Sequence, residues 1–393
     1  MKSGWTTKKL GEVCEVQLGK MLDKAKNKGK PYKYLANLSV RWRSFDLANL
    51  RTMPFMDSEV EKFSLRPGDV LMCEGGEPGR CAIWQIPDSD IKFQKAVHRI
   101  RSKGTIEPAY LVAYFESIVN TVEFNSRLTG ATIKHLPRER LLEIPIPIPP
   151  LAEQKRIVAK IDAAFEKIDR LKANAEKNLA NAKELFQSAL DEAMRPKKGW
   201  VEKRLGEIGT TLTGMTPSTK DKSNFGNYMP FVKPADIASF TPVNYREDGL
   251  SEKGVAASRL VKRDSVLMVC IGASIGKTGY ADRDCTCNQQ INVLMPKTGF
   301  DGRYLYYILS SEKFKKRLIS ESGQTTLPII AKSKWENLSV CITLSLDEQK
   351  QIAKRLDLLS QKLEVLQQNY ARQIADCAEM RQAILREAFE GRL

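Results

Sequence analysis

Few residues in this sequence have the types and spacing that catalysis or metal binding requires. Only two histidines, His98 and His135, occur among 393 residues. The chain therefore offers very few residues for a histidine-based metal site or a catalytic triad. Among the eight cysteines there is no paired CxxC spacing, and Cys285 and Cys287 are too close in sequence for a zinc pair. We therefore predict no catalytic residues and no metal site.

One segment resembles a phosphate-binding loop. Residues 272–278 read GASIGKT, but the GxxxxGK[ST] pattern requires a glycine at position 271, where the sequence has Ile271. We interpret this segment as a turn between two strands, because Gly79 and Arg80 occupy an equivalent place earlier in the chain. An NPPY or DPPY motif, which holds a flipped base in DNA methyltransferases, is missing too: the proline cluster at 144–150 contains no Asn or Asp.

The chain is strongly basic, with 63 Lys and Arg against 47 Asp and Glu and a formal net charge of +16. Most of the excess lies in residues 1–150 and 199–345, and such a balance favours a polyanionic partner. No apolar run approaches the roughly 20 residues of a membrane helix, and the N-terminal residues lack the apolar core of a signal peptide. We expect a cytoplasmic protein with reduced cysteines and no membrane contact.

The sequence contains an internal repeat, with two copies that together fill the chain. Residues 4–13 return as residues 199–208, with six of ten positions identical. Further pairs share this shift of 195: residues 153–155 with 348–350, and Asp162 with Asp357. Residues 1–150 and 199–345 combine turn residues with short apolar runs, which predicts two mixed α+β domains. Within them we expect helices at 109–127 and 303–320.

Each domain is followed by a long run of helix formers, at 151–198 and at 346–393, after an extended proline-rich or apolar segment. Apolar residues recur there at spacings of three and four, as in a coiled coil. In the first run they include Ile161, Phe165, Ile168, Ala175, Leu179, Phe186 and Ala193, and in the second Leu356, Leu359, Leu363, Leu366, Tyr370, Ile374 and Cys377. Such a helix is roughly 60 Å long and needs a partner. We predict that the two helices pair in antiparallel orientation and relate the domains by a pseudo-two-fold repeat.

These motifs together resemble the specificity subunit of Type I restriction-modification systems. The specific features are the GWxxKxLGE openings at 4–12 and 199–207, the helix starts LAEQ (151–154) and LDEQ (346–349), and the ending REAFEGRL at 386–393. Residues 34–40, 68–71 and 98–101 resemble one type of target-recognition domain, whereas 213–218 and 287–290 resemble another. The two domains are therefore expected to read different DNA sequences.

The resemblance implies a non-catalytic subunit that reads a bipartite target on double-stranded DNA, one half-site per domain with an unread gap. It also implies that the chain docks two modification (methyltransferase) subunits and, through them, two restriction (motor-nuclease) subunits. The methyl donor S-adenosylmethionine then binds in the modification subunit, and this chain binds no cofactor.

Candidate DNA-contacting residues in the first domain are basic side chains that lie beside aromatic residues or in Gly/Pro loops, and those in the second domain are polar or charged side chains in comparable places. In the first domain they are Arg41, Arg43, Arg80, Lys95, His98, Arg99, Lys134, His135 and Arg138; in the second they are Lys220, Lys222, Lys233, Asp236, Lys277, Gln289, Gln290 and Thr326. Because LAEQ and LDEQ recur at both domain-helix junctions, we assign partner docking to Glu153, Gln154, Glu348 and Gln349. For any single one of these residues the alternative is a solvated surface charge or a helix start.

Two other functions fit the composition less well. One is a basic coiled-coil adaptor that binds DNA without sequence preference. The other is a nucleic-acid enzyme with a cryptic active site. Sequence preference distinguishes the first alternative, and activity of the chain alone distinguishes the second.

Overall fold

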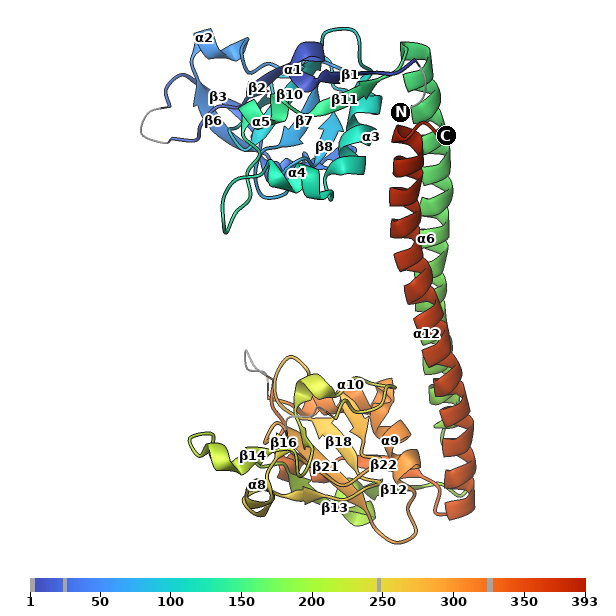
Figure 1. Cartoon of the computed structure of the whole chain (residues 1–393). Coiled ribbons are helices and arrows are strands. Elements are labelled where there is room, and N and C mark those ends of the chain that lie inside the picture. Colours follow the sequence, from blue (N-terminus) through green and yellow to red (C-terminus); the bar gives the residue numbers. More distant parts are fainter. Residues whose placement is uncertain (1–3, 24–26, 246–248, 324–327) are drawn as a thin grey trace. The chain divides into compact units, whose positions relative to one another are not determined.

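The computed structural model describes residues 4–23, 27–245, 249–323 and 328–393. The chain divides into two compact units, Met1–Asn174 with Gln373–Leu393, and Ala175–Arg372. Each unit contains one globular domain and one part of each long helix, α6 (Leu151–Ala193) and α12 (Leu346–Phe389), which are green and red in Figure 1.

The first domain is built on an antiparallel sheet of four strands in the order β2-β10-β7-β8. These strands are β2 (Cys14–Leu18), β10 (Val97–Ser102), β7 (Val70–Cys73) and β8 (Cys81–Ile83). The smaller sheets are β6-β3-β9, β1-β11 and β4-β5, formed by β6 (Arg51–Phe55), β3 (Lys30–Leu35), β9 (Lys92–Phe93), β1 (Thr6–Lys9), β11 (Pro145–Ile148), β4 (Val40–Arg41) and β5 (Ser44–Phe45). The helices are α1 (Leu10–Val13), α2 (Asp57–Val60), α3 (Pro108–Ile118), α4 (Val122–Ser126), α5 (Arg138–Leu142) and the 3-10 turn η1 (Asn37–Ser39).

The second domain repeats this plan with a four-stranded antiparallel sheet in the order β13-β21-β18-β19. Its strands are β13 (Gly209–Thr213), β21 (Ile291–Pro296), β18 (Val266–Val269) and β19 (Thr278–Tyr280). The smaller sheets are β15-β20-β17, β12-β22 and β14-β16, formed by β15 (Phe231–Val232), β20 (Cys285–Cys287), β17 (Leu260–Val261), β12 (Val201–Arg204), β22 (Ser339–Ile342), β14 (Phe225–Gly226) and β16 (Gly249–Leu250). The helices are α7 (Leu205–Ile208), α8 (Glu252–Ala256), α9 (Gly302–Ser310), α10 (Glu312–Glu321), α11 (Lys332–Glu336) and the 3-10 turns η2 (Lys222–Asn224) and η3 (Pro234–Asp236).

Strand β7 shows why the central sheet is stable in each domain. All four of its residues are buried, because alternate side chains point to opposite faces and both faces are covered. Val70 and Met72 pack in a core that includes helix α3, whereas Leu71 and Cys73 pack against the β6-β3-β9 sheet. Strand β18 repeats this alternation in the second domain.

The two helices expected at 109–127 and 303–320 are each broken in two. Thr121 caps a new helix by accepting a hydrogen bond from Phe124 N at 3.2 Å, and Ser311 does the same for Phe314 N at 3.3 Å. Thr and Ser side chains compete with the helical backbone in this way, so the single-helix prediction was wrong at both places.

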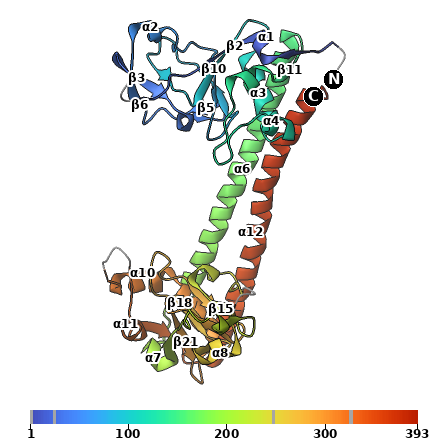
Figure 2. The same cartoon turned by 60° about the vertical axis from the view of Figure 1, so that its left-hand side comes forward.

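The long helices pair in antiparallel orientation within each unit (Figure 2). In the first unit, Arg156 near the start of α6 donates to the Leu393 carbonyl oxygen at 2.7 Å, and Arg381 donates to Asp169 at 2.5 Å. In the second unit, Phe186 near the end of α6 shares a core with Leu356 near the start of α12. The predicted fold class is therefore confirmed. Within the described residues, no helix has both the length and the apolarity of a membrane span.

Candidate nucleic-acid interface

One end of the central sheet of the first domain gathers loops that are far apart in sequence. The loop after β7 is the centre: Glu74 N donates to Ala96 O at 2.8 Å, and Leu136 N donates to Glu74 O at 2.7 Å. Asn37 Nδ2 donates to Gly75 O at 3.2 Å from a third loop. We call residues 36–41, 74–80, 94–96 and 128–136 the first recognition edge.

The second domain builds an equivalent edge with the same backbone bonds. Cys270 N donates to Gln290 O at 2.8 Å, and Ile330 N donates to Cys270 O at 3.0 Å. We call residues 233–238, 270–277, 288–290 and 328–330 the second recognition edge. Its loop 270–277 joins β18 to β19, which confirms the interpretation of GASIGKT as a turn between strands. Val269 N donates to Lys277 O as Cys73 N donates to Arg80 O, so Lys277 is equivalent to Arg80.

Several predicted DNA contacts are exposed or half-buried, and all of these except Arg138, Lys220 and Lys222 belong to the two recognition edges. In the first domain they are Arg41, Lys95, Lys134, His135 and Arg138, and in the second they are Lys220, Lys222, Lys233, Lys277, Gln289 and Gln290. His135 lies 3.0 Å from Glu74, and Gln289 accepts a hydrogen bond from Thr216 at 2.5 Å. Thr326 lies outside the described residues. Contact of these side chains with DNA stays a prediction.

Other predicted contacts point into the protein. His98 is fully buried with Nε2 2.9 Å from Leu136 O, and burial lowers its pKa. Arg99 donates to Ser64 O at 2.6 Å, and Arg80 donates to Asn37 O at 2.9 Å. The buried Asp236 accepts from Lys233 N at 2.9 Å and so stabilises the turn η3. The structure gives these four side chains internal partners, so direct contact with DNA would require them to rearrange.

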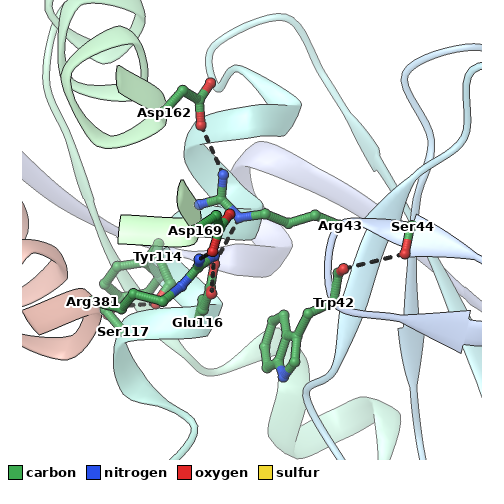
Figure 3. Close-up of polar contacts among 9 residues, drawn as sticks. All are labelled: Trp42, Arg43, Ser44, Tyr114, Glu116, Ser117, Asp162, Asp169 and Arg381. Atoms are coloured by element: carbon green, nitrogen blue, oxygen red, sulfur yellow. Dashed lines mark hydrogen bonds and ion pairs between the residues drawn. The ribbon is translucent and has the colours of Figure 1, made fainter. Parts of the chain in front are cut away.

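Arg43 is also turned inward, at the junction between the first domain and helix α6 (Figure 3). It lies in the tight turn between β4 and β5 with a left-handed backbone, φ 61°. Its Nε donates to Glu116 of α3 at 2.8 Å, and Nη1 donates to Asp162 of α6 at 2.8 Å. The guanidinium also lies 4.7 Å from the ring centroid of Phe165. Arg43 thus joins this turn to the helix, and direct contact with DNA would require its side chain to rearrange.

The second junction places Asp357, the repeat equivalent of Asp162, in the same role with different partners. Arg303 Nε donates to Asp357 at 2.5 Å, and the Tyr307 hydroxyl donates to the same oxygen at 2.7 Å. The Arg303 guanidinium is 4.7 Å from the Tyr280 ring centroid. The sequence did not single out either arginine-aspartate contact as a site, although the match of Asp162 with Asp357 in the repeat was a signal for both.

The two glutamines assigned to partner docking are fully buried inside their units. Gln154 Oε1 accepts from Glu107 N at 2.8 Å, and its Nε2 donates to Pro149 O at 2.8 Å. Gln349 repeats this arrangement with Asp301 N at 2.8 Å and Thr343 O at 3.0 Å. Their recurrence at both junctions thus follows from helix anchoring, and a fully buried side chain cannot contact a partner in this conformation.

The two glutamates assigned to partner docking, Glu153 and Glu348, are more exposed than the two glutamines. Glu153 is bonded to Arg156 at 2.6 Å, and Glu348 accepts from Trp200 Nε1 at 3.4 Å. Both remain partly exposed, so their docking role stays a prediction. Trp200 packs on the core of the second unit, as Trp5 does in the first.

Known proteins share this architecture. The family model for the Type I restriction modification DNA specificity domain matches residues 2–180 and 197–372. The chain is 23% identical over 376 residues to the StySPI specificity subunit of Salmonella potsdam, covering 89% of this chain and 80% of that one. It is 29% identical over 171 residues to the MjaIX specificity subunit of Methanocaldococcus jannaschii, covering 42% of this chain and 39% of that relative.

A solved structure, reported for complex assembly and conformational transition of the type I R-M system, matches with a TM-score of 0.80 and 25% identity. The match covers 100% of this chain and 99% of the other. The two segments matched by the family model coincide with the two repeats, each with its own recognition edge. The chain therefore belongs to the specificity-subunit family of Type I restriction-modification systems.

Proposed function

We propose that this chain reads a bipartite DNA target, with one half-site for each recognition edge. The observation that carries the proposal is the repetition of one edge with different side chains at equivalent places. The segment 288–290 replaces 94–96, so that Gln289 takes the place of Lys95, while the backbone bond to the central loop is kept. A shared scaffold with changed side chains suits two domains that read different base sequences.

The chemistry is assigned to partner subunits. The chain docks two modification subunits, which bind S-adenosylmethionine and methylate a flipped adenine, and through them two restriction subunits. The two-fold repeat within one chain supports two copies of the same partner. The matching solved structure was reported for complex assembly of the type I R-M system, which supports a partner subunit. We place the complex in the cytoplasm, where it reaches host DNA.

Sequencing the methylated adenines of a host with and without this chain tests the proposal. We expect a two-part motif with a fixed gap that disappears when the chain is deleted. An unchanged methylation pattern, in a host whose modification subunit is active, contradicts it.

The purified chain alone should neither methylate nor cut DNA, and methyl transfer should appear when the modification subunit and S-adenosylmethionine are added. Methylation by the isolated chain would instead support the cryptic enzyme. Equal binding to all duplex sequences would support the non-specific adaptor.

A further inference from the structure

A pocket opens on the first domain beside the first recognition edge. It has a volume of about 410 Å³ and is lined by residues from the turn after β3, the β4-β5 hairpin, the start of β6 and the end of β9. The lining residues that matter here are Asn37, Leu38, Arg41, Asn49, Arg51 and Gln94. Of these six, only Arg41 was among the predicted contacts.

Three polar side chains of this pocket are available to bind a ligand. The side chains of Asn49, Arg51 and Gln94 have no hydrogen-bond or ion-pair partner within the part of the chain that the structure describes. In the second domain, the backbone equivalent of Gln94 is Asn288, whose amide donates to Gln290 at 3.1 Å. At this position, therefore, the two domains differ: the amide is free in the first domain and bonded in the second.

The chemistry of these groups matches one kind of base pair. The amide of Asn or Gln can form two hydrogen bonds with the N6 and N7 edge of adenine in the major groove. Leu38, whose side chain is 68% exposed, supplies an apolar contact of the kind that recognises the thymine methyl group. Arg51 supplies a cation suited to a neighbouring phosphate.

The pocket walls are held in place before any ligand binds. Arg41 lies two residues before Arg43, which is fastened to Glu116 and Asp162 (Figure 3). The turn that carries Leu38 is tied to the central loop, because Asn37 donates to Gly75 O and accepts from Arg80. Such preorganisation lowers the entropic cost of recognition.

We infer that this pocket reads A·T base pairs of the first half-site. Asn49 and Gln94 each hold one adenine, Leu38 lies against a thymine methyl, and Arg51 binds the backbone beside them. This inference rests on the proposed function and adds to it the identity of base-reading residues in one domain.

The test compares Asn49→Ala and Gln94→Ala with Gln85→Ala in the full chain assembled with its modification subunit. Gln85 is an exposed amide of the same domain that does not line the pocket, which makes it a matched control. Duplexes randomised at each position of the target are selected for binding and sequenced. Each pocket variant should lose about 10-fold discrimination for adenine at one position of the first half-site. Base preferences in the second half-site should not change, and Gln85→Ala should leave all preferences intact.

The isosteric variants Asn49→Asp and Gln94→Glu guard against misfolding, and unchanged discrimination in the second half-site shows that each variant is assembled. Arg51→Ala should weaken binding to all sequences equally. If the pocket variants keep every base preference, or lose affinity uniformly, the inference is overturned. If the unmodified chain shows no sequence preference at all, it is the proposed function that fails.

Discussion

Arg43 donates a hydrogen bond of 2.8 Å to Asp162, and this contact fastens a hairpin of the first domain to helix α6. Asp357, one repeat later, accepts from Arg303 of α9 in the second domain. The two aspartates are equivalent in sequence, but their arginines come from different elements. The two repeats therefore make the same kind of domain-helix contact, but with arginines that are not equivalent in sequence.

Replacing these aspartates should affect the two units unequally. Asp162→Asn removes the ion pair with Arg43. Because the Asp162 side chain is 55% exposed, we expect a loss of about 1 kcal/mol or less in the free energy of unfolding. Asp357→Asn weakens two hydrogen bonds at a less exposed site, and we expect a loss of about 1 to 3 kcal/mol. Urea unfolding measures both, with Asp376→Asn on the exposed face of α12 as the control. Equal losses for all three variants would contradict the anchoring role.

The buried glutamines should matter for stability before any partner is present. Gln154→Ala and Gln349→Ala each leave a backbone N-H and carbonyl groups unpaired in the interior, so each should cost about 1 to 3 kcal/mol. Glu153→Ala should change the stability of the chain far less, because its carboxylate is partly exposed. Thermal unfolding of the free chain checks this order. If both glutamine variants unfold like the unmodified chain but no longer bind the modification subunit, the docking assignment is the better one.

Lysines on the first recognition edge should contribute to DNA binding by contacting backbone phosphates. Lys134→Ala should weaken DNA binding by a similar factor for every sequence, because a lysine on the backbone carries no base information. The slope of log K against log salt should fall by about 0.9 for the lost contact. Fluorescence anisotropy over a salt series measures the slope. A change in base preference without a change in slope would instead show that Lys134 reads a base.

Acidification should destabilise the first unit through His98. Burial lowers the pKa of His98 in the folded chain, so the unfolded chain takes up a proton first as pH falls. The stabilising contribution is complete above the unfolded pKa of about 6.5 and decreases below it. His98→Gln should flatten the dependence of unfolding free energy on pH between about 7 and 5.5. A slope that persists unchanged in this variant would mean that another group titrates.

The helix pair should set the gap between the half-sites. Four residues inserted in α6 near Ala175 lengthen the helix by roughly 6 Å and rotate its far end by only about 40°. A matching insertion after Arg372 keeps α12 in register with it. The methylated motif should keep both half-sites and gain roughly one or two base pairs of gap. Two-residue insertions rotate the far end by about 200° and should abolish methylation. An unchanged gap with full activity would contradict the role of the helices as a spacer.

Local and periodic features of this protein could be predicted from the sequence alone. The repeat, the seam of Ile161, Phe165 and Phe186, and the turn at 270–277 all depend on spacing along one segment, which the chain displays directly. The same information indicated the family, because its motifs lie at the domain-helix junctions.

The direction of each polar side chain was decided only by the tertiary structure. Arg41 and Arg43 are two residues apart in one basic cluster, yet one lines a pocket and the other pairs with Glu116 and Asp162. Gln154 resembled a docking residue because it recurs, and its burial appears only when the loop ending at Glu107 folds against it. Partners more than 40 residues away determine these orientations, because an unpaired polar group is costly in the interior, and no local pattern records them.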